Sequence, residues 1–306
     1  MAITTKNFQI MTDMNLAWQV MTESCMPIGK GSMPAPFFEY ALSSSWMDKR
    51  FLYLNRFWMD GDKPVGFVFY ESPVTMILFA LCPGYEYLAE EMIAYADKEM
   101  PGKPGEKELV LFPAQTALIG AAKKLQYEVA WEQTDMLCDF EKTELNYELP
   151  DGFSFVDKEN IDPVKLAKCC WKGFDHEDKG AFAGWDELDT DYSDDWTPAK
   201  GYQGVLSSFL APPPHATYEY SVVIKDKEGE YACYSGMWFV KENALAYMEP
   251  LCTIPEYRGL GLARAALSRH YRILKPMGAK IMTGGGNEFY KKIGYTEPFL
   301  WLHMKR

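Results

Sequence analysis

The residues best suited to chemistry follow one apolar run in the second half of the chain. The run Leu245–Cys252 has the pattern of a strand, a proline soon interrupts it, and Arg258–Ala263 opens a helical pattern. Gly259 and Gly261 remove side chains where a phosphate could approach the backbone. The helix N-terminus offers unpaired N–H groups and the positive end of its dipole, and Arg258 adds a charge-assisted donor. This combination predicts a pyrophosphate-binding turn.

Two other interpretations of this turn remain open. The residues Gly-Leu-Gly-Leu-Ala could be a degraded dinucleotide-binding fingerprint, although the third spaced glycine and the initial βαβ position are missing. A tight strand-to-helix turn without any ligand would explain both glycines, but it would not explain the arginine.

The segment 244–296 resembles the GNAT superfamily of acetyl-CoA-dependent N-acetyltransferases. The pyrophosphate motif of that family, Arg/Gln-x-x-Gly-x-Gly/Ala, is matched by Arg258, Gly261 and Ala263, and residues 253–257 fit the approach to it. Downstream, Asn287 and Tyr290 resemble the family's cofactor-binding strand–helix segment. The resemblance implies acetyl-CoA as co-substrate. The cofactor-binding residues that it implies are Leu251, Cys252, Thr253, Arg258, Gly259, Leu260, Gly261, Leu262, Ala263 and Asn287.

The reaction that the resemblance implies is direct attack of a neutral amine on the acetyl thioester. Backbone N–H groups near Leu251 and Cys252 are candidate donors to the oxyanion, and Thr253 would continue the backbone contacts to the pantetheine arm. Glu249 is the candidate base, since alternation places it on one face with apolar neighbours, including Tyr247, and burial would raise its pKa. A carboxylate that faces solvent or forms a structural ion pair is the open alternative.

The resemblance also implies that Tyr290 is the acid that protonates the departing thiolate. A core aromatic at helical spacing with Ile293 is the alternative for this tyrosine. Cys252 could suggest a covalent acyl-enzyme, but no neighbour in sequence could act as its base, so we expect a packing residue.

The elements that would hold these residues occur twice in the chain. Each half contains an apolar strand, a turn with Asp-Gly or Glu-Gly, a second strand, a third strand that ends near a Cys and a Pro, a helix, a short strand, a helix and a last strand. The closing helices end in similar sequences, Lys123–Glu128 and Lys291–Thr296. Ordered matches of this kind indicate a divergent duplication.

The predicted fold class is α/β, with two tandem GNAT-like units that each have a mixed, mostly antiparallel central sheet flanked by helices. Turn residues near Glu144–Gly152 place the boundary, which gives domains 1–145 and 146–306. In the first half the place of the arginine loop is acidic, with Glu86, Glu90 and Glu91, and like charges disfavour a pyrophosphate. We therefore expect a degenerate first unit and the acetyl-CoA site in the second.

The charge of the chain bears on its partners. The net charge of −12 argues against nucleic acid and favours a cationic small molecule or a basic peptide as acceptor. Residues 175–195 hold nine acids against one lysine, a balance of −8, beside Trp185, Tyr192 and Trp196. This stretch could attract and cage a cation, or it could be a solvated loop.

Other features restrict the class of protein further. Seven cysteines without C-x-x-C spacing indicate reduced thiols, and four scattered histidines give no metal motif, so no metal site is predicted. The first twenty residues lack a signal-peptide pattern, and no apolar run is long enough to span a bilayer. We expect a cytoplasmic N-acetyltransferase that acts on a primary amine of a small molecule or peptide. A non-catalytic acyl-CoA-binding sensor and a protein lysine acetyltransferase are the alternatives.

Overall fold

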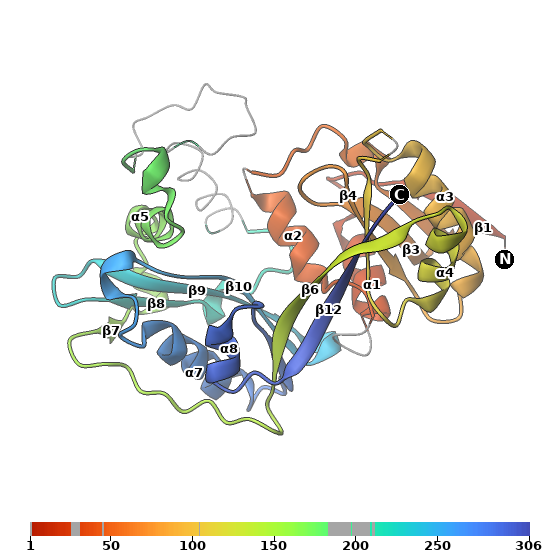
Figure 1. The fold of residues 1–306 in the computed structure, drawn as a ribbon. Coiled ribbons are helices and arrows are strands. Elements are labelled where there is room, and N and C mark those ends of the chain that lie inside the picture. Colours follow the sequence, from red (N-terminus) through yellow and green to blue (C-terminus); the bar gives the residue numbers. More distant parts are fainter. Residues whose placement is uncertain are drawn as a thin grey trace. The chain divides into compact units, whose positions relative to one another are not determined.

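The computed structural model describes residues 2–25, 31–44, 46–103, 105–182, 197, 209 and 212–306. These residues form two compact units (Figure 1). Unit 1 comprises Met1–Leu42, Met47–Met136 and Pro298–Arg306, and unit 2 comprises Ser43–Trp46 and Leu137–Glu297.

The sheet of unit 1 has the strand order β1-β2-β3-β4-β5-β12. Its strands are β1 (Ile3–Asn7), β2 (Arg56–Asp60), β3 (Lys63–Tyr70), β4 (Met76–Leu81), β5 (Glu108–Leu111) and β12 (Glu297–Lys305). Only β4 and β5 pair in parallel among these neighbours. The helices are α1 (Met14–Ser24), α2 (Ala35–Ser43), α3 (Ala89–Glu99) and α4 (Thr116–Lys124), with short turns η1 (Leu52–Leu54) and η2 (Glu86–Leu88).

Unit 1 forms around a hairpin and an aromatic core. Asp60 pairs with Lys63 across a two-residue turn, in which Gly61 takes a φ of 61°, a conformation that glycine adopts without steric cost. On the sheet, the ring of Phe67 stacks against Phe57 at 4.3 Å and against Phe69 at 5.0 Å between centroids. Burial of these rings supplies much of the apolar contact area of the unit.

The sheet of unit 2 has the order β6-β11-β10-β9-β8-β7. Its strands are β7 (Ser154–Phe155), β8 (Val222–Lys225), β9 (Tyr231–Val240), β10 (Leu245–Thr253), β11 (Ile281–Thr283) and the end of β6 (Glu128–Asp139). Only β10 and β11 are parallel. The helices are α5 (Pro163–Gly173), α7 (Leu262–Leu274) and α8 (Glu288–Lys292), with short turns η3 (Lys158–Asn160), η4 (His176–Lys179), η5 (Tyr218–Tyr220), η6 (Lys241–Asn243) and η7 (Pro255–Tyr257).

Among the described helices, α5 and α7 pack against the sheet of unit 2, and the start of α5 is clear from the sequence. Asp162 caps α5 by accepting hydrogen bonds from the N–H groups of Val164 and Lys165, and a proline occupies the first helical position. Residues of α5 and of α7 contribute to two separate apolar clusters against the strands. The sheet is therefore covered by packed helices, as the predicted fold class requires.

The last strand of each half pairs, over part of its length, with a strand of the other half. In unit 1, β12 pairs with β5, with Leu302 opposite Leu111. In unit 2, the end of β6 pairs with β11, with Cys138 opposite Met282. A division after residue 145 places both strands in the halves from which they come, whereas the compact units divide β6 after Met136 and place Pro298–Arg306 in unit 1. Sequence order alone does not reveal these pairings, because antiparallel partners are chosen by tertiary packing.

Candidate active site

A register shift interrupts β10 at the predicted catalytic segment. Before the shift Met248 lies opposite Met237 of β9, and after it Leu251 lies opposite Ser235. Two residues of β10, Glu249 and Pro250, therefore share one position of the neighbouring strand. This is a β-bulge, a feature that bends a strand and re-aims its side chains.

The register also shows where the N–H groups after the bulge point. The N–H of Ile254 donates to the carbonyl oxygen of Ala232 on β9 at 3.0 Å. Antiparallel pairs alternate between hydrogen-bonded and non-hydrogen-bonded types, so Cys252 also faces β9, and Leu251 and Thr253 face the opposite edge. Of the two candidate oxyanion donors, the Leu251 N–H points to the open edge of β10, whereas the Cys252 N–H points toward β9.

The opposite edge of β10 is paired over only part of its length. Its neighbour β11 pairs with it at Leu245 and Ala246, and the Thr283 hydroxyl then accepts a hydrogen bond of 2.8 Å from the Met248 N–H. Strand β11 ends at Thr283, while β10 continues to Thr253. Among the described strands, none pairs with this edge of the last part of β10, so an extended, amide-containing ligand could bind to its backbone groups there.

The predicted pyrophosphate turn joins β10 to α7. Gly259 and Gly261 have φ angles of 80° and 96°, a region that favours glycine, and a Cβ atom at Gly259 would meet open space. Gly261 caps α7 without a side-chain hydrogen bond, and no acid lies in the first turn. The first N–H groups of α7, at Leu262 and Ala263, therefore form the kind of anion-binding site that helix N-termini provide.

Arg258 lies in this turn, where its guanidinium is bonded to the protein. Nε donates to the Thr253 carbonyl oxygen at 3.1 Å, and Nη2 donates to the Gly173 carbonyl oxygen at 2.9 Å. Nη2 also pairs with both carboxylate oxygens of Asp175, at 2.9 and 3.0 Å. The arginine thus connects the end of β10 to the end of α5. The sequence did not predict its contacts with Gly173 and Asp175.

Glu249, the candidate base, lies in the bulge and is half-buried. The hydroxyl of Tyr247 donates a hydrogen bond of 2.7 Å to its Oε2 atom. The two side chains therefore meet, as alternation along a strand predicts. The register shift lies between Met248 and Leu251, so the alternation is interrupted before Leu251, which packs against the α7-side cluster.

The other candidate catalytic residue, Tyr290, follows β11. It is buried in α8, and its ring lies 5.2 Å from that of Tyr295. A Cβ atom at Gly284 would come within 2.6 Å of the Tyr290 ring, so the glycine after β11 makes room for this tyrosine. Asn287 caps α8, since its Oδ1 accepts a hydrogen bond of 3.1 Å from the Phe289 N–H. Its side-chain oxygen thus has a structural partner.

Cys252 is a core residue. Its side chain is 4% exposed and packs in one apolar cluster with Cys169, Cys170 and Tyr234. A Cβ atom at Gly173 would lie 2.8 Å from its Sγ atom, so α5 also approaches it closely. These surroundings agree with the expectation of a packing residue.

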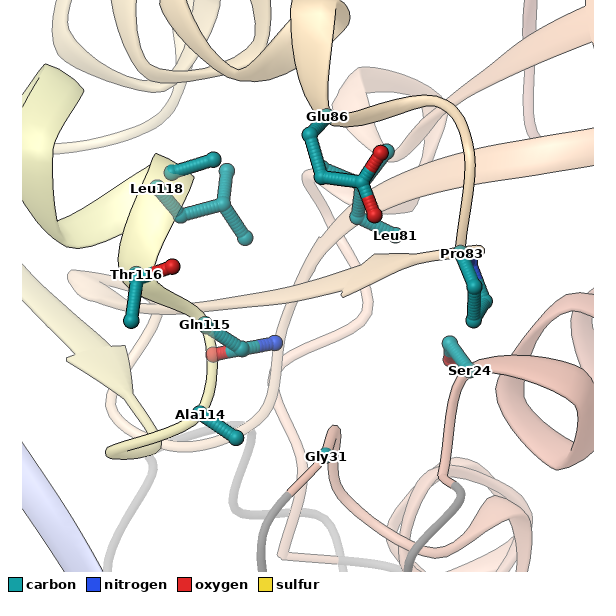
Figure 2. Close-up of a pocket in the computed structure, with 10 residues that line it drawn as sticks. Ser24, Gly31, Leu81, Pro83, Glu86, Ala114, Gln115, Thr116 and Leu118 are labelled. Carbon is teal, nitrogen blue, oxygen red and sulfur yellow. The ribbon is translucent and has the colours of Figure 1, made fainter.

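The corresponding turn of unit 1 carries acidic side chains instead of an arginine. Oε1 of Glu86 accepts a hydrogen bond of 3.0 Å from the Gly84 N–H, and Glu90 and Glu91 lie in the first turn of α3. Figure 2 shows the Glu86 side chain at the edge of a cavity of about 170 Å³, across from Thr116 and Leu118. Carboxylates thus occupy the part of unit 1 in which unit 2 has a glycine-rich turn and an arginine.

Parts of the prediction lie outside the described residues. Trp185, Tyr192, Trp196 and the six acids from 186 to 195 are among them, whereas Asp175 and the turn η4 are described. In the described part of the chain, no three His, Cys, Asp or Glu side chains could jointly hold a metal ion. No helix in that part is long and apolar enough to cross a bilayer.

Several solved structures match this chain over nearly its whole length. An acetyltransferase of the GNAT family from Colwellia psychrerythraea matches with a TM-score of 0.58 and 12% identity, over 99% of this chain and 100% of its own. A tandem GNAT protein from the clavulanic acid biosynthesis pathway matches with a TM-score of 0.55 and 10% identity, over 99% and 98%. A GCN5-related N-acetyltransferase from Sphaerobacter thermophilus matches with a TM-score of 0.54 and 10% identity, over 99% and 95%.

No protein-family model matches the sequence, and neither does any curated protein. The likeness therefore concerns the fold, which is the GNAT fold. More specifically, the chain has two GNAT-like units in tandem, and this confirms the predicted fold class.

Proposed function

We propose that this protein is an N-acetyltransferase that transfers the acetyl group of acetyl-CoA to a primary amine. One observation carries the proposal. In unit 2, a bulged strand with a partly open edge leads directly into a glycine-rich turn at a helix N-terminus. The open strand edge can bind the amides of a pantetheine arm. The glycine-rich turn at the helix N-terminus can bind a pyrophosphate.

The residues of the site fit acetyl-CoA. The edge of β10 at Leu251 and Thr253 would hold the amides of the pantetheine arm, and Arg258–Ala263 would hold the pyrophosphate. No acid lies in the first turn of α7, so nothing on that turn repels phosphate. When bound, acetyl-CoA supplies the activated acetyl group, and every other task falls to the chain itself.

Three groups of the chain take part in the reaction, as a base, an oxyanion donor and an acid. Glu249 accepts the proton of the attacking ammonium, which requires a carboxylate that is ionised and held in place, here by Tyr247. The Leu251 N–H donates to the carbonyl oxygen on which negative charge develops. Tyr290 donates its proton to the departing sulfur. The net charge of −12 favours a cationic acceptor, either a small amine or a basic peptide.

A transfer screen tests the proposal. Purified protein is titrated with acetyl-CoA by calorimetry, and thiol release is then followed with polyamines, amino acids, aminoglycosides and peptides. The proposal expects binding and amine-dependent release that Glu249→Gln reduces. Binding without release for any acceptor would favour the sensor, release with proteins alone would favour a lysine acetyltransferase, and absence of binding would exclude all three.

A further inference from the structure

Gly236 of β9 lies in very close contact with the bulge of β10. A Cβ atom built on Gly236 would lie 2.2 Å from the carbonyl oxygen of Glu249 and 2.8 Å from Cδ of Pro250. One neighbour is backbone and the other is a closed ring, so neither can rotate away as the end of a flexible side chain would. The bulge of β10 therefore fills the space in which a side chain at position 236 would begin.

Unit 1 contains the same strand pair without a bulge. Strands β3 and β4 pair in an unbroken register, with Gly66 opposite Leu81 and Phe67 opposite Ala80. Since a cysteine follows both Leu81 and Leu251, Phe67 occupies the position in unit 1 that Gly236 occupies in unit 2. A large aromatic residue is thus accommodated where the ladder is regular, and glycine is found where the ladder is bulged.

We infer that Gly236 is a positioning residue of the candidate active site. Its missing side chain lets the two residues Glu249 and Pro250 fold against β9 as a bulge, and the bulge sets the Glu249 carboxylate relative to the Leu251 N–H. The inference rests on the proposed function for its consequence in catalysis, whereas its structural part stands independently. A glycine inside a strand is the kind of residue that accompanies a bulge or a close backbone approach.

Two variants separate the bulge from general packing. In Gly236→Ala, the methyl group collides with the bulge, so we expect a melting temperature lower by roughly 5 °C. Deletion of Pro250 in that variant removes the extra residue of β10, so that Met248 stays opposite Met237 and Leu251 stays opposite Ser235 without a bulge. We expect this second change to restore the melting temperature, because the alanine then faces a regular ladder.

Transfer kinetics give the functional readout. Both variants should retain part of their acetyl-CoA affinity, because the turn Arg258–Ala263 is intact, whereas kcat should fall by about 10²-fold or more, because the bulge no longer sets the Leu251 N–H relative to the Glu249 carboxylate. Gly66→Ala on β3 is the matched control, since its added methyl group meets mainly the flexible thioether of Met92 at 3.0 Å. It should leave kcat unchanged.

The outcomes are distinct. Failure of the Pro250 deletion to restore stability would overturn the structural part, and an unchanged kcat in a folded Gly236→Ala would overturn the positioning role. If the unaltered chain neither binds acetyl-CoA nor transfers an acetyl group, the proposed function fails. The melting temperatures alone then still decide whether Gly236 accommodates the bulge.

Discussion

The hydroxyl of Tyr247 lies 2.7 Å from Oε2 of Glu249, two residues further along β10. The tyrosine donates, so the bond stabilises the ionised form of the Glu249 carboxylate. The orientation of the candidate base is thus held by a neighbour on its own strand.

Tyr247→Phe should therefore destabilise the ionised carboxylate of Glu249, because the variant lacks this hydrogen-bond donor. Less of the carboxylate would be ionised at a given acidic pH, so the acidic limb of kcat/KM should move to higher pH while the alkaline limb stays in place. A pH profile of kcat/KM measures the shift. An acidic limb that does not move would show that Glu249 is not the titrating base.

Glu249→Gln and Tyr290→Phe should each slow the chemical step by about 10²–10⁴, the usual contribution of a positioned base or acid. The loss in Glu249→Gln should be partly recovered at high pH, where more of the free amine is already neutral. Tyr290→Phe should show no such recovery, because a missing acid is not replaced by removing protons. Pre-steady-state rates across pH distinguish the two, and wild-type rates in both would make these residues structural.

Arg258→Glu should weaken acetyl-CoA binding at least about tenfold, because a charge-assisted hydrogen bond contributes roughly 1.5–3 kcal/mol. Asp175→Asn gives the sharper test. If Arg258 turns to the pyrophosphate, removal of its carboxylate partner should strengthen acetyl-CoA binding severalfold. If Arg258 only stabilises the turn, the same substitution should weaken acetyl-CoA binding. Calorimetry measures both, with the exposed Lys98→Gln of unit 1 as a control that should leave affinity unchanged.

One acetyl-CoA should bind per chain. In unit 1, Glu86 already accepts the Gly84 N–H, and two further carboxylates lie at the start of α3, so a pyrophosphate would meet negative charge there. The stoichiometry of a calorimetric titration measures this directly. Two equivalents per chain would contradict the assignment of unit 1 as degenerate.

His270 should make stability depend on pH. The ring is fully buried on α7, where it shares a hydrogen bond of 2.9 Å with Ser235, and burial lowers its pKa to about 3. Between that value and the unfolded pKa of about 6.5, the unfolded state binds more protons, so this contribution is complete above pH 6.5 and decreases as pH falls.

From pH 7 to pH 5, His270 alone should reduce the free energy of unfolding by about 2 kcal/mol. Urea denaturation of the wild type and of His270→Gln at both values measures the difference. The variant should lose less stability on acidification. Equal losses in the two proteins would show that the histidine does not titrate in this way.

Local chemistry explains which parts could be predicted from the sequence. The turn Asp60–Asp62 and the helix start at Gly261 depend on residues within a few positions of each other, and both occur where expected. The bulge opposite Gly236 depends on the register between two strands, and the partners of Arg258 come from a helix more than eighty residues away. Periodicity in one segment carries no information about such pairings. A glycine inside the strand pattern Tyr231–Val240 was a signal for the bulge.

The place of β12 in unit 1 affects how the chain can be synthesised and divided. When the first 136 residues have left the ribosome, β5 still lacks its neighbour β12, whose residues follow about 160 positions later. An unpaired apolar edge is a template for aggregation, so the sheet of unit 1 stays incomplete until translation reaches residue 305. A fragment that ends at residue 145 would retain that bare edge permanently. The sheet of unit 1 is therefore completed only after the residues of unit 2 have been synthesised.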